Sequence, residues 1–187
     1  ALAGRALPTA AEYADLVRRG WGPDAGQVLA TYPVTRYLSP ADAWVAVHAD
    51  GSWACPSMRL DTALAARGPV YGYEFAAPDL PLLPPVPGLT LGATHGAEMA
   101  FLFDLPSAPG TPPPPALTPD QKRLSDEMIR VWTTFARTGT ASDIPAWTSR
   151  DRRLGVFGQP GRSTDLTISD QRSAHHCGMW DAISSAR

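Results

Sequence analysis

Apolar residues recur with a helical period near both ends of the chain and over a long segment in its second half. Thr9 and Glu12 have the spacing of a capping box at the start of a helix. Tyr13 and Val17 then share one face of a short helix, which Gly20 should end. Similar start and stop signals predict further short helices over 24–32, from Ser39 onward, over 56–67 and over 175–184.

The strongest helical pattern lies between Thr118 and Gly139. Thr118 and Gln121 can form a capping box around Pro119, whose missing amide hydrogen costs nothing in the first turn. The apolar residues that follow have the spacing of one helix face. They form a single stripe of Leu124, Met128, Val131, Trp132 and Phe135, which we expect to be buried.

Three short segments predict β-strands. Residues 70–75 are aromatic and β-branched and lie between Pro69 and Pro78. Residues 154–157 and 166–169 are expected to form a small hairpin-like pair. Only the first segment has the pattern of a strand buried on both faces, as in the middle of a parallel sheet. One such strand cannot form a sheet, so we expect its neighbours to come from outside this chain.

Composition narrows the classes of function. Of the 187 residues, 44% are hydrophobic and 18% are charged, and the formal net charge is −2. The chain has enough apolar material for a core but no excess of basic residues, which argues against nucleic acid or an anionic membrane as a partner. Its longest apolar runs are far shorter than the roughly 20 residues of a membrane helix. Because it begins at Ala1 without a methionine or a signal-peptide pattern, we expect a processed chain or a fragment.

His95 is the histidine whose surroundings best suit catalysis. Gly92 and Gly96 flank it, and it lies after the predicted strand and before a short helix. Glycine lets the backbone and a ligand approach closely, and loops beyond strand ends carry catalytic groups in α/β enzymes. From the residues alone, a plain loop histidine remains an equal alternative. His48 lies within a helical stretch and is expected to be an ordinary structural histidine.

Five segments of this sequence also occur together, in this order, in one known family. They are the Trp-Ala-Cys-Pro run at 53–56, the aromatic strand at 71–75, the sequence GATHGAEMAFLF at 92–103, the helix end WTTFARTG at 132–139 followed by Trp147, and the terminal segment 176–181. They resemble the type B carboxylesterases, a group that includes cholinesterases and para-nitrobenzyl esterases. Residues 92–103 resemble the segment that carries the catalytic histidine of that family.

The resemblance implies an α/β-hydrolase fold and a serine hydrolase that cleaves small carboxylic esters without a cofactor or a metal. In such enzymes the triad runs in chain order Ser, then Glu or Asp, then His. His95 would be the general base that takes the serine proton and later returns it to the leaving alcohol. Glu98 matches a glutamate that often follows the histidine, and we expect it to support His95 from a distance. A structural salt bridge is the other interpretation of Glu98.

Other parts of this machinery are missing from the sequence. No G-x-S-x-G motif occurs, and no glycine-rich oxyanion segment precedes His95. We therefore interpret residues 1–187 as the C-terminal portion of a single α/β-hydrolase domain, with a late central strand, a histidine loop, C-terminal helices and an incomplete sheet. Alone it would be inactive, and it would act on an ester only together with the N-terminal part of the same hydrolase. The alternative is a non-catalytic remnant or a binding module derived from a carboxylesterase.

The two cysteines, Cys55 and Cys177, match positions that resemble those of an intrachain disulfide in cholinesterases. This resemblance favours a secreted or otherwise extracytoplasmic protein, because disulfides persist in oxidising compartments. Two buried free thiols in a cytoplasmic protein are the alternative. A zinc site from both cysteines with His175 and His176 is disfavoured, since adjacent ligands rarely point at one metal.

Overall fold

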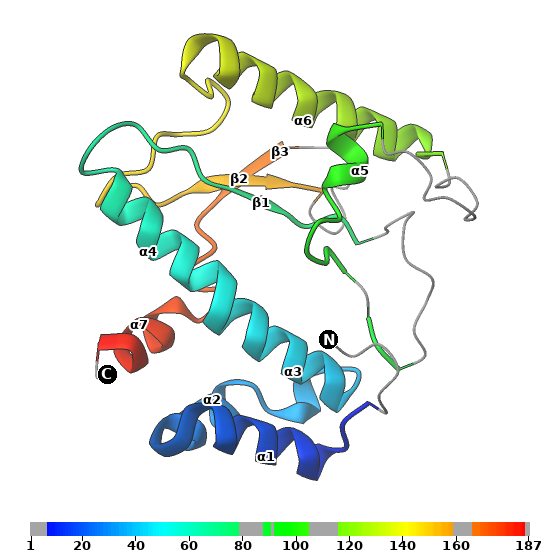
Figure 1. Cartoon of the computed structure of the whole chain (residues 1–187), viewed down its shortest axis with the longest axis vertical. Helices are drawn as coiled ribbons and strands as arrows, with labels where there is room; N and C mark the ends of the chain where they lie inside the picture. The colour runs from blue at the N-terminus through cyan, green and yellow to red at the C-terminus, as the bar shows by residue number, and fades with distance from the viewer. Residues whose placement is uncertain (1–6, 79–87, 91, 105–115, 159–165, 186–187) are drawn as a thin grey trace. The chain divides into compact units, whose positions relative to one another are not determined.

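The structure is a computed structural model that describes residues 7–78, 88–90, 92–104, 116–158 and 166–185. The chain divides into two compact units, which are described separately (Figure 1). The helical unit consists of Ala1–Arg59, Pro85–Thr90 and Arg172–Arg187. The sheet unit consists of Leu60–Pro84 and Leu91–Gln171.

Short helices make up the helical unit. They are α1 (Ala10–Trp21), α2 (Ala25–Thr31), α3 (Pro40–Ala49), the first part of α4 (Cys55–Leu64) and α7 (Cys177–Ser185). The predicted capping box of Thr9 and Glu12 is present at the start of α1. The expected end at Gly20 is wrong, because α1 continues to Trp21 and Gly22 caps it with a φ of 52°. A residue with a side chain rarely adopts that conformation, so Gly22 is the better stop.

Aromatic side chains and a disulfide hold the core of the helical unit. Tyr13, Val28, Tyr32 and Val47 are almost completely buried. A single π-helical segment, Asp50–Ala54, joins α3 to α4. A Cβ atom at Gly51 would lie 2.9 Å from the indole of Trp180, so this connection can approach α7 only because residue 51 is glycine.

Three short strands form the described sheet, in the order β1–β2–β3. They are β1 (Tyr73–Phe75), β2 (Leu154–Phe157) and β3 (Leu166–Ser169). β2 and β3 form the antiparallel pair that the sequence predicts, with Leu154 opposite Ser169. β1 runs parallel to β2, with Tyr73 opposite Gly155 and Phe75 opposite Phe157.

Two predictions about this sheet are wrong. The buried strand is β2, in which every residue is buried, whereas Tyr73 of β1 is 37% exposed. β2 also gives β1 a neighbour from within this chain. The reason is that β2 lies between two strands, while β1 is the last strand on its side among the described residues.

Two helices cover one face of the sheet, α5 (Met99–Leu102) and α6 (Pro119–Thr138) (Figure 1). The capping box of Thr118 and Gln121 is present, and Gly139 ends α6 in the left-handed conformation with a φ of 72°. The end of α4 also belongs to the sheet unit, where the indole nitrogen of Trp147 donates to the hydroxyl of Thr62 on this helix at 3.1 Å.

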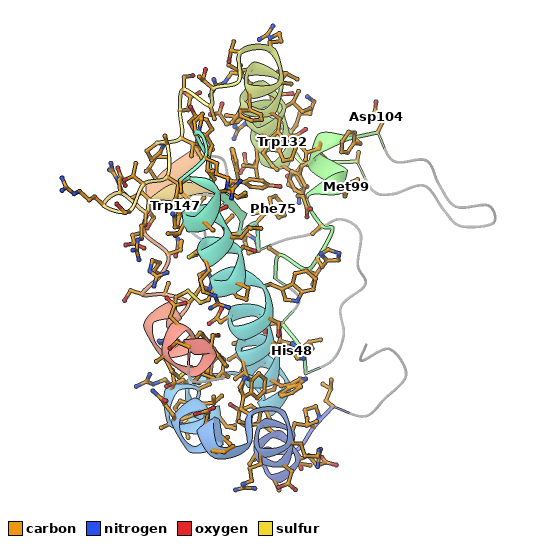
Figure 2. All side chains as sticks on the ribbon, turned by 60° about the vertical axis from the view of Figure 1, so that its left-hand side comes forward. His48, Phe75, Met99, Asp104, Trp132 and Trp147 are labelled. Atoms are coloured by element: carbon orange, nitrogen blue, oxygen red, sulfur yellow. A yellow bond between two sulfur atoms is a disulfide. The ribbon has the colours of Figure 1, made fainter. Side chains whose placement is uncertain are left out.

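The stripe along α6 is only partly buried. Leu124, Met128 and Val131 are in the core as predicted, but Trp132 is 44% exposed and Phe135 is 46% exposed. Trp132 is labelled on α6 in Figure 2. The expectation for these two aromatic residues is therefore wrong. They lie on the flank of α6 that faces Tyr71 and Tyr73, where the sheet has reached its last described strand.

Candidate active site around His95

His95 lies in a tight turn of the sheet unit, directly before α5. The amide of Ala97 donates to the carbonyl of Thr94 at 3.0 Å, and the amide of Met99 donates to the carbonyl of Gly96 at 3.1 Å. Gly96 has a φ of 81°, which favours glycine at this position. His95 is exposed in this turn.

The turn is anchored through α5 to the core of the sheet unit. Phe101 is 1% exposed, and its ring lies 5.0 Å from that of Phe75 on β1. The buried hydroxyl of Ser125 on α6 donates to the carbonyl of Phe101 at 2.7 Å. These contacts anchor the backbone from which the His95 side chain extends, which suits a general base.

Glu98 is half-buried and acts electrostatically on β1. The pKa of the Tyr73 phenol is raised, mainly by burial and additionally by the negative charge of Glu98. The carboxylate of Glu98 therefore lies within electrostatic range of the strand that precedes the histidine turn. Tyr73 was not among the sequence candidates, because a tyrosine in an aromatic strand looks like an ordinary core residue.

The cysteines lie together in the helical unit, where Cys55 and Cys177 form a disulfide. Both residues are fully buried. The carbonyl of His175 lies 3.4 Å from the Cys55 sulfur. Among the described residues, no group of three or more histidine, cysteine or acidic side chains is placed to hold a metal ion.

A buried polar network beside this disulfide was missed by the sequence reasoning. His175, considered there only as a zinc ligand, has its Nδ1 atom 2.7 Å from Asp50. The other carboxylate oxygen of Asp50 accepts from the hydroxyl of Tyr32 at 2.8 Å. That hydroxyl in turn accepts from the indole of Trp180 at 2.8 Å. Every group in this network has a hydrogen-bond partner, and most of them are buried. We therefore interpret the network as structural and not as a reactive site.

Helices long and apolar enough to cross a membrane are absent from the part of the chain that the structure describes. The predictions against a membrane or nucleic-acid partner are not tested further and remain predictions.

Comparison with known proteins gives consistent matches. The model of the carboxylesterase family matches residues 30–180. The chain is 36% identical to the acetylcholinesterase of Bungarus fasciatus over 134 residues, which are 68% of this chain and 20% of that protein. A thermophilic PNB esterase matches with a TM-score of 0.64 and 20% identity, over 95% of this chain and 35% of that one. The carboxylesterase of Geobacillus stearothermophilus matches with a TM-score of 0.64 and 24% identity, over 93% of this chain and 35% of that one.

These matches confirm the α/β-hydrolase fold that the sequence predicts. The chain spans about a third of the esterase structures, at 34–35% of their length, and 20% of the acetylcholinesterase. The family match includes His95, Glu98 and both cysteines and covers most of the sequence. This chain therefore belongs to the carboxylesterase family.

Proposed function

We propose that the chain contributes the histidine of a serine carboxylic ester hydrolase, with His95 as its general base and acid. The observation that carries this proposal is an exposed histidine on a glycine-containing turn, anchored to a buried core, in a chain of the carboxylesterase family. The nucleophilic serine and the acid would come from the part of the hydrolase that precedes this portion, either in the same polypeptide or as a separate chain.

The chemistry requires a group that can gain and lose a proton near neutral pH. An imidazole suits this role, because the ordinary pKa of histidine is about 6.5. His95 would take the hydroxyl proton as the serine oxygen bonds to the ester carbonyl carbon. It would then give that proton to the alkoxide as the carbon–oxygen bond to the alcohol breaks. In the second half, His95 would deprotonate the water that attacks the acyl-enzyme and return the proton to serine.

Glu98 would assist as a positioning residue. Its negative charge reaches at least as far as the phenol of Tyr73. Three positions from His95, the same charge would favour the imidazolium that forms during the reaction. In the Glu98→Gln variant of the active enzyme, kcat should fall while KM stays close to that of the parent. A purely structural role would change the amount of folded enzyme but leave kcat per folded molecule in place.

The direct test is labelling with a fluorophosphonate, which reacts with an activated serine. Native material from the source is labelled and then separated under reducing, denaturing conditions. We expect the label on a longer polypeptide that contains this sequence, or on a second chain that copurifies with it. In the His95→Ala variant, labelling should fall about 10⁴-fold, as for the loss of a triad member.

His48→Ala is the matched control, because His48 is also exposed and its Nδ1 lies 3.1 Å from the hydroxyl of Ser52. This variant should label at the normal rate. Absence of label from all material associated with the 187 residues would refute the enzymatic proposal. The chain would then be a non-catalytic derivative of an esterase. Equal labelling of the His95→Ala variant would refute the role of His95.

The proposed substrate is a small-molecule carboxylic ester, bound only when the rest of the hydrolase is present. We further propose a secreted or extracytoplasmic location, which the disulfide supports because such bonds persist in oxidising compartments.

A further inference from the structure

Asp50 is a buried carboxylate that the chemistry proposed for His95 does not use. It is only 6% exposed, so its negative charge is costly unless a positive charge or hydrogen bonds compensate it. Among the described residues, two side chains lie within hydrogen-bond distance of this carboxylate. They are the hydroxyl of Tyr32 at 2.8 Å and the Nδ1 atom of His175 at 2.7 Å. Of the two, only the imidazole of His175 can carry a positive charge.

The phenols around Asp50 keep their neutral form near neutral pH. Burial raises the pKa of Tyr32, and the negative charge of Asp50 acts in the same direction. Burial and the charge of Asp50 also raise the pKa of Tyr37. His176 is a further titratable neighbour, but its ring packs against that of Tyr32, with the ring centroids 5.1 Å apart. In the described part of the helical unit, His175 is therefore the group in contact with Asp50 whose charge can change in this pH range.

The other charged groups on α7 do not change their charge in this range. Asp181 pairs with Arg172 at 2.5 Å and with Arg59 at 3.0 Å. Partial burial acts to raise the pKa of Asp181, but the two arginines lower it overall. These three side chains therefore stay ionised from mildly acidic to mildly basic pH, and they cannot supply a response to pH near neutrality.

His175 belongs to the segment that leads into α7. The amide of Cys177 donates to the carbonyl of Arg172 at 2.8 Å, and its sulfur is bonded to Cys55. Between them, His176 has a φ of 52°, which is uncommon for a residue other than glycine and costs free energy. The contacts on either side, namely the disulfide and the hydrogen bond of His175, must hold this segment in place.

The same carboxylate is connected to the body of α7. The Tyr32 hydroxyl that contacts Asp50 also accepts a hydrogen bond from the indole of Trp180 at 2.8 Å, and Trp180 is 2% exposed. A Cβ atom at Gly51 would lie 2.9 Å from this indole, so α7 packs directly on the residue that follows Asp50. The charge balance at Asp50 therefore acts on α7 both through His175 and through Tyr32.

From this geometry we infer that the contact between Asp50 and His175 is a pH-sensitive switch, which holds the start of α7 and the adjoining disulfide most tightly at mildly acidic pH. A nearby carboxylate favours the protonated imidazole, which compensates the buried charge of Asp50. As the pH rises from about 5 to about 8, the imidazole loses its proton and only neutral hydrogen-bond donors remain. The stabilisation is therefore complete at the acidic end of this range and is lost towards its basic end. The switch does not depend on the role proposed for His95.

Hydrogen exchange measured by mass spectrometry tests the switch on the native polypeptide that contains this chain. Exchange rates between pH 5 and pH 8 are divided by those of an unfolded reference at the same pH, which removes the intrinsic effect of pH on exchange. For peptides that cover residues 172–180, we expect the protection to fall about tenfold from pH 5 to pH 8, as for a differential interaction equivalent to one pH unit.

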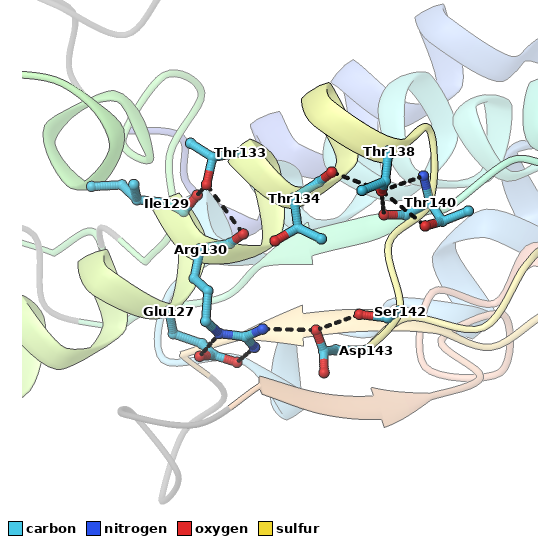
Figure 3. A network of polar contacts seen from close by, with 9 residues as sticks. All are labelled: Glu127, Ile129, Arg130, Thr133, Thr134, Thr138, Thr140, Ser142 and Asp143. Atoms are coloured by element: carbon cyan, nitrogen blue, oxygen red, sulfur yellow. Dashed lines mark hydrogen bonds and ion pairs between the residues drawn. The ribbon is translucent and has the colours of Figure 1, made fainter.

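α6 provides an internal reference within the same sample. Arg130 binds Glu127 at 2.7 Å and Asp143 at 2.9 Å near the end of this helix, as Figure 3 shows. These hydrogen bonds raise the pKa of Arg130 further above its already high ordinary value. Because this network contains no histidine, peptides from α6 should keep the same protection between pH 5 and pH 8.

Two variants remove the switch in different ways. Asp50→Asn keeps the shape of the side chain and an acceptor for Tyr32 but carries no charge, and His175→Gln removes the titrating group. In both variants the protection of residues 172–180 should change less than about twofold over this pH range. His176→Asn is the matched control, because it removes the adjacent histidine and asparagine tolerates the left-handed conformation. This variant should keep the tenfold fall.

Equal protection at pH 5 and pH 8 in the native polypeptide would overturn the inference. A tenfold fall that persists in Asp50→Asn or in His175→Gln would also overturn it, since another group would then be responsible. The same holds for a fall that disappears in His176→Asn. If Asp50→Asn does not fold, His175→Gln decides the question, because it leaves the carboxylate and its bond to Tyr32 in place.

Discussion

The Nδ1 atom of His175 lies within hydrogen-bond distance of Asp50, at 2.7 Å, although 125 positions separate the two residues in the sequence. The pair joins the turn before α7 to the π-helical segment after α3, immediately beside the disulfide. Tyr32 supplies the second hydrogen bond to Asp50, which is only 6% exposed. This network therefore links three segments of the helical unit that are distant in sequence.

Replacement of Asp50 by alanine should destabilise the helical unit by about 3 kcal/mol. The substitution leaves the buried hydroxyl of Tyr32 without its acceptor and the ring of His175 without its hydrogen-bond partner on Asp50. Urea unfolding followed by tryptophan fluorescence measures the loss. Asp15→Ala is the control, because Asp15 is exposed and its ion pair with Arg18 should contribute less than about 0.5 kcal/mol. Equal effects of the two substitutions would contradict a stabilising role for the network.

Reduction of the disulfide should lower the free energy of unfolding by about 3–5 kcal/mol. Cys55 and Cys177 are 122 positions apart, so the reduced unfolded chain gains a large conformational entropy. Thermal unfolding with and without reductant, and of the Cys55→Ala/Cys177→Ala double variant, measures this effect. If native material alkylated at once after lysis carries two free thiols by mass spectrometry, both the disulfide and the extracytoplasmic location are rejected.

Sequence reasoning succeeded where structure is set by neighbouring residues. Thr118, Gln121 and Gly139 fix both ends of α6 through local hydrogen bonds and backbone conformation, and the structure has these caps where the sequence places them. The hairpin-like pairing of β2 and β3 was also predicted, because two short apolar strands follow each other closely along the chain.

The same reasoning failed where burial depends on distant partners. The aromatic pattern of β1 resembles a central strand, but its position in the sheet leaves Tyr73 at an edge. β2 contains Gly155, which weakens its strand pattern, yet a Cβ atom there would lie 2.8 Å from Ile144, so the position is tightly packed. Trp132 continues the stripe of α6 by spacing alone, and spacing cannot tell whether a covering element is present.

For the candidate site, resemblance and local pattern suggested His95, whose role stays a prediction, and the pairing of the two cysteines, which the structure has. They did not predict the surroundings of these residues. The electrostatic link from Glu98 to Tyr73 joins a turn to a strand more than twenty positions earlier in the sequence. The pairing of Asp50 with His175 leaves no motif, since neither residue has a diagnostic neighbour. Such contacts depend on the folded arrangement and could not be predicted from spacing.

The helical unit should lose stability in acid, because the stabilising charge of Asp181 is then neutralised. Partial burial acts to raise its pKa, but hydrogen bonds from Arg172 at 2.5 Å and Arg59 at 3.0 Å outweigh burial and lower the pKa overall. A carboxyl with a lowered folded-state pKa adds stability above its unfolded value, and the gain is lost as the pH falls through the folded value. Asp181→Asn should thus cost about 1 kcal/mol at pH 7 and almost nothing near pH 2. Denaturant unfolding at both pH values measures the difference, and a cost that is the same at both would contradict the assigned charge interaction.

Asp61 should have the opposite dependence in the sheet unit. Burial raises the pKa of its carboxyl, whose Oδ2 would lie 3.1 Å from a Cβ atom at Gly72. Because the folded chain then holds the proton more tightly than the unfolded chain, stability is greatest below the unfolded pKa and falls as the pH rises towards the folded value. The isosteric Asp61→Asn variant cannot ionise, so it should be more stable than the parent at pH 7, by an amount of the order of 1 kcal/mol, and similar to it at pH 3.

Asp126→Asn, on the exposed face of α6, should change stability little at either pH. Urea unfolding curves at the two pH values test this, and a destabilised Asp61→Asn variant at pH 7 would show that the carboxylate makes a favourable contact instead.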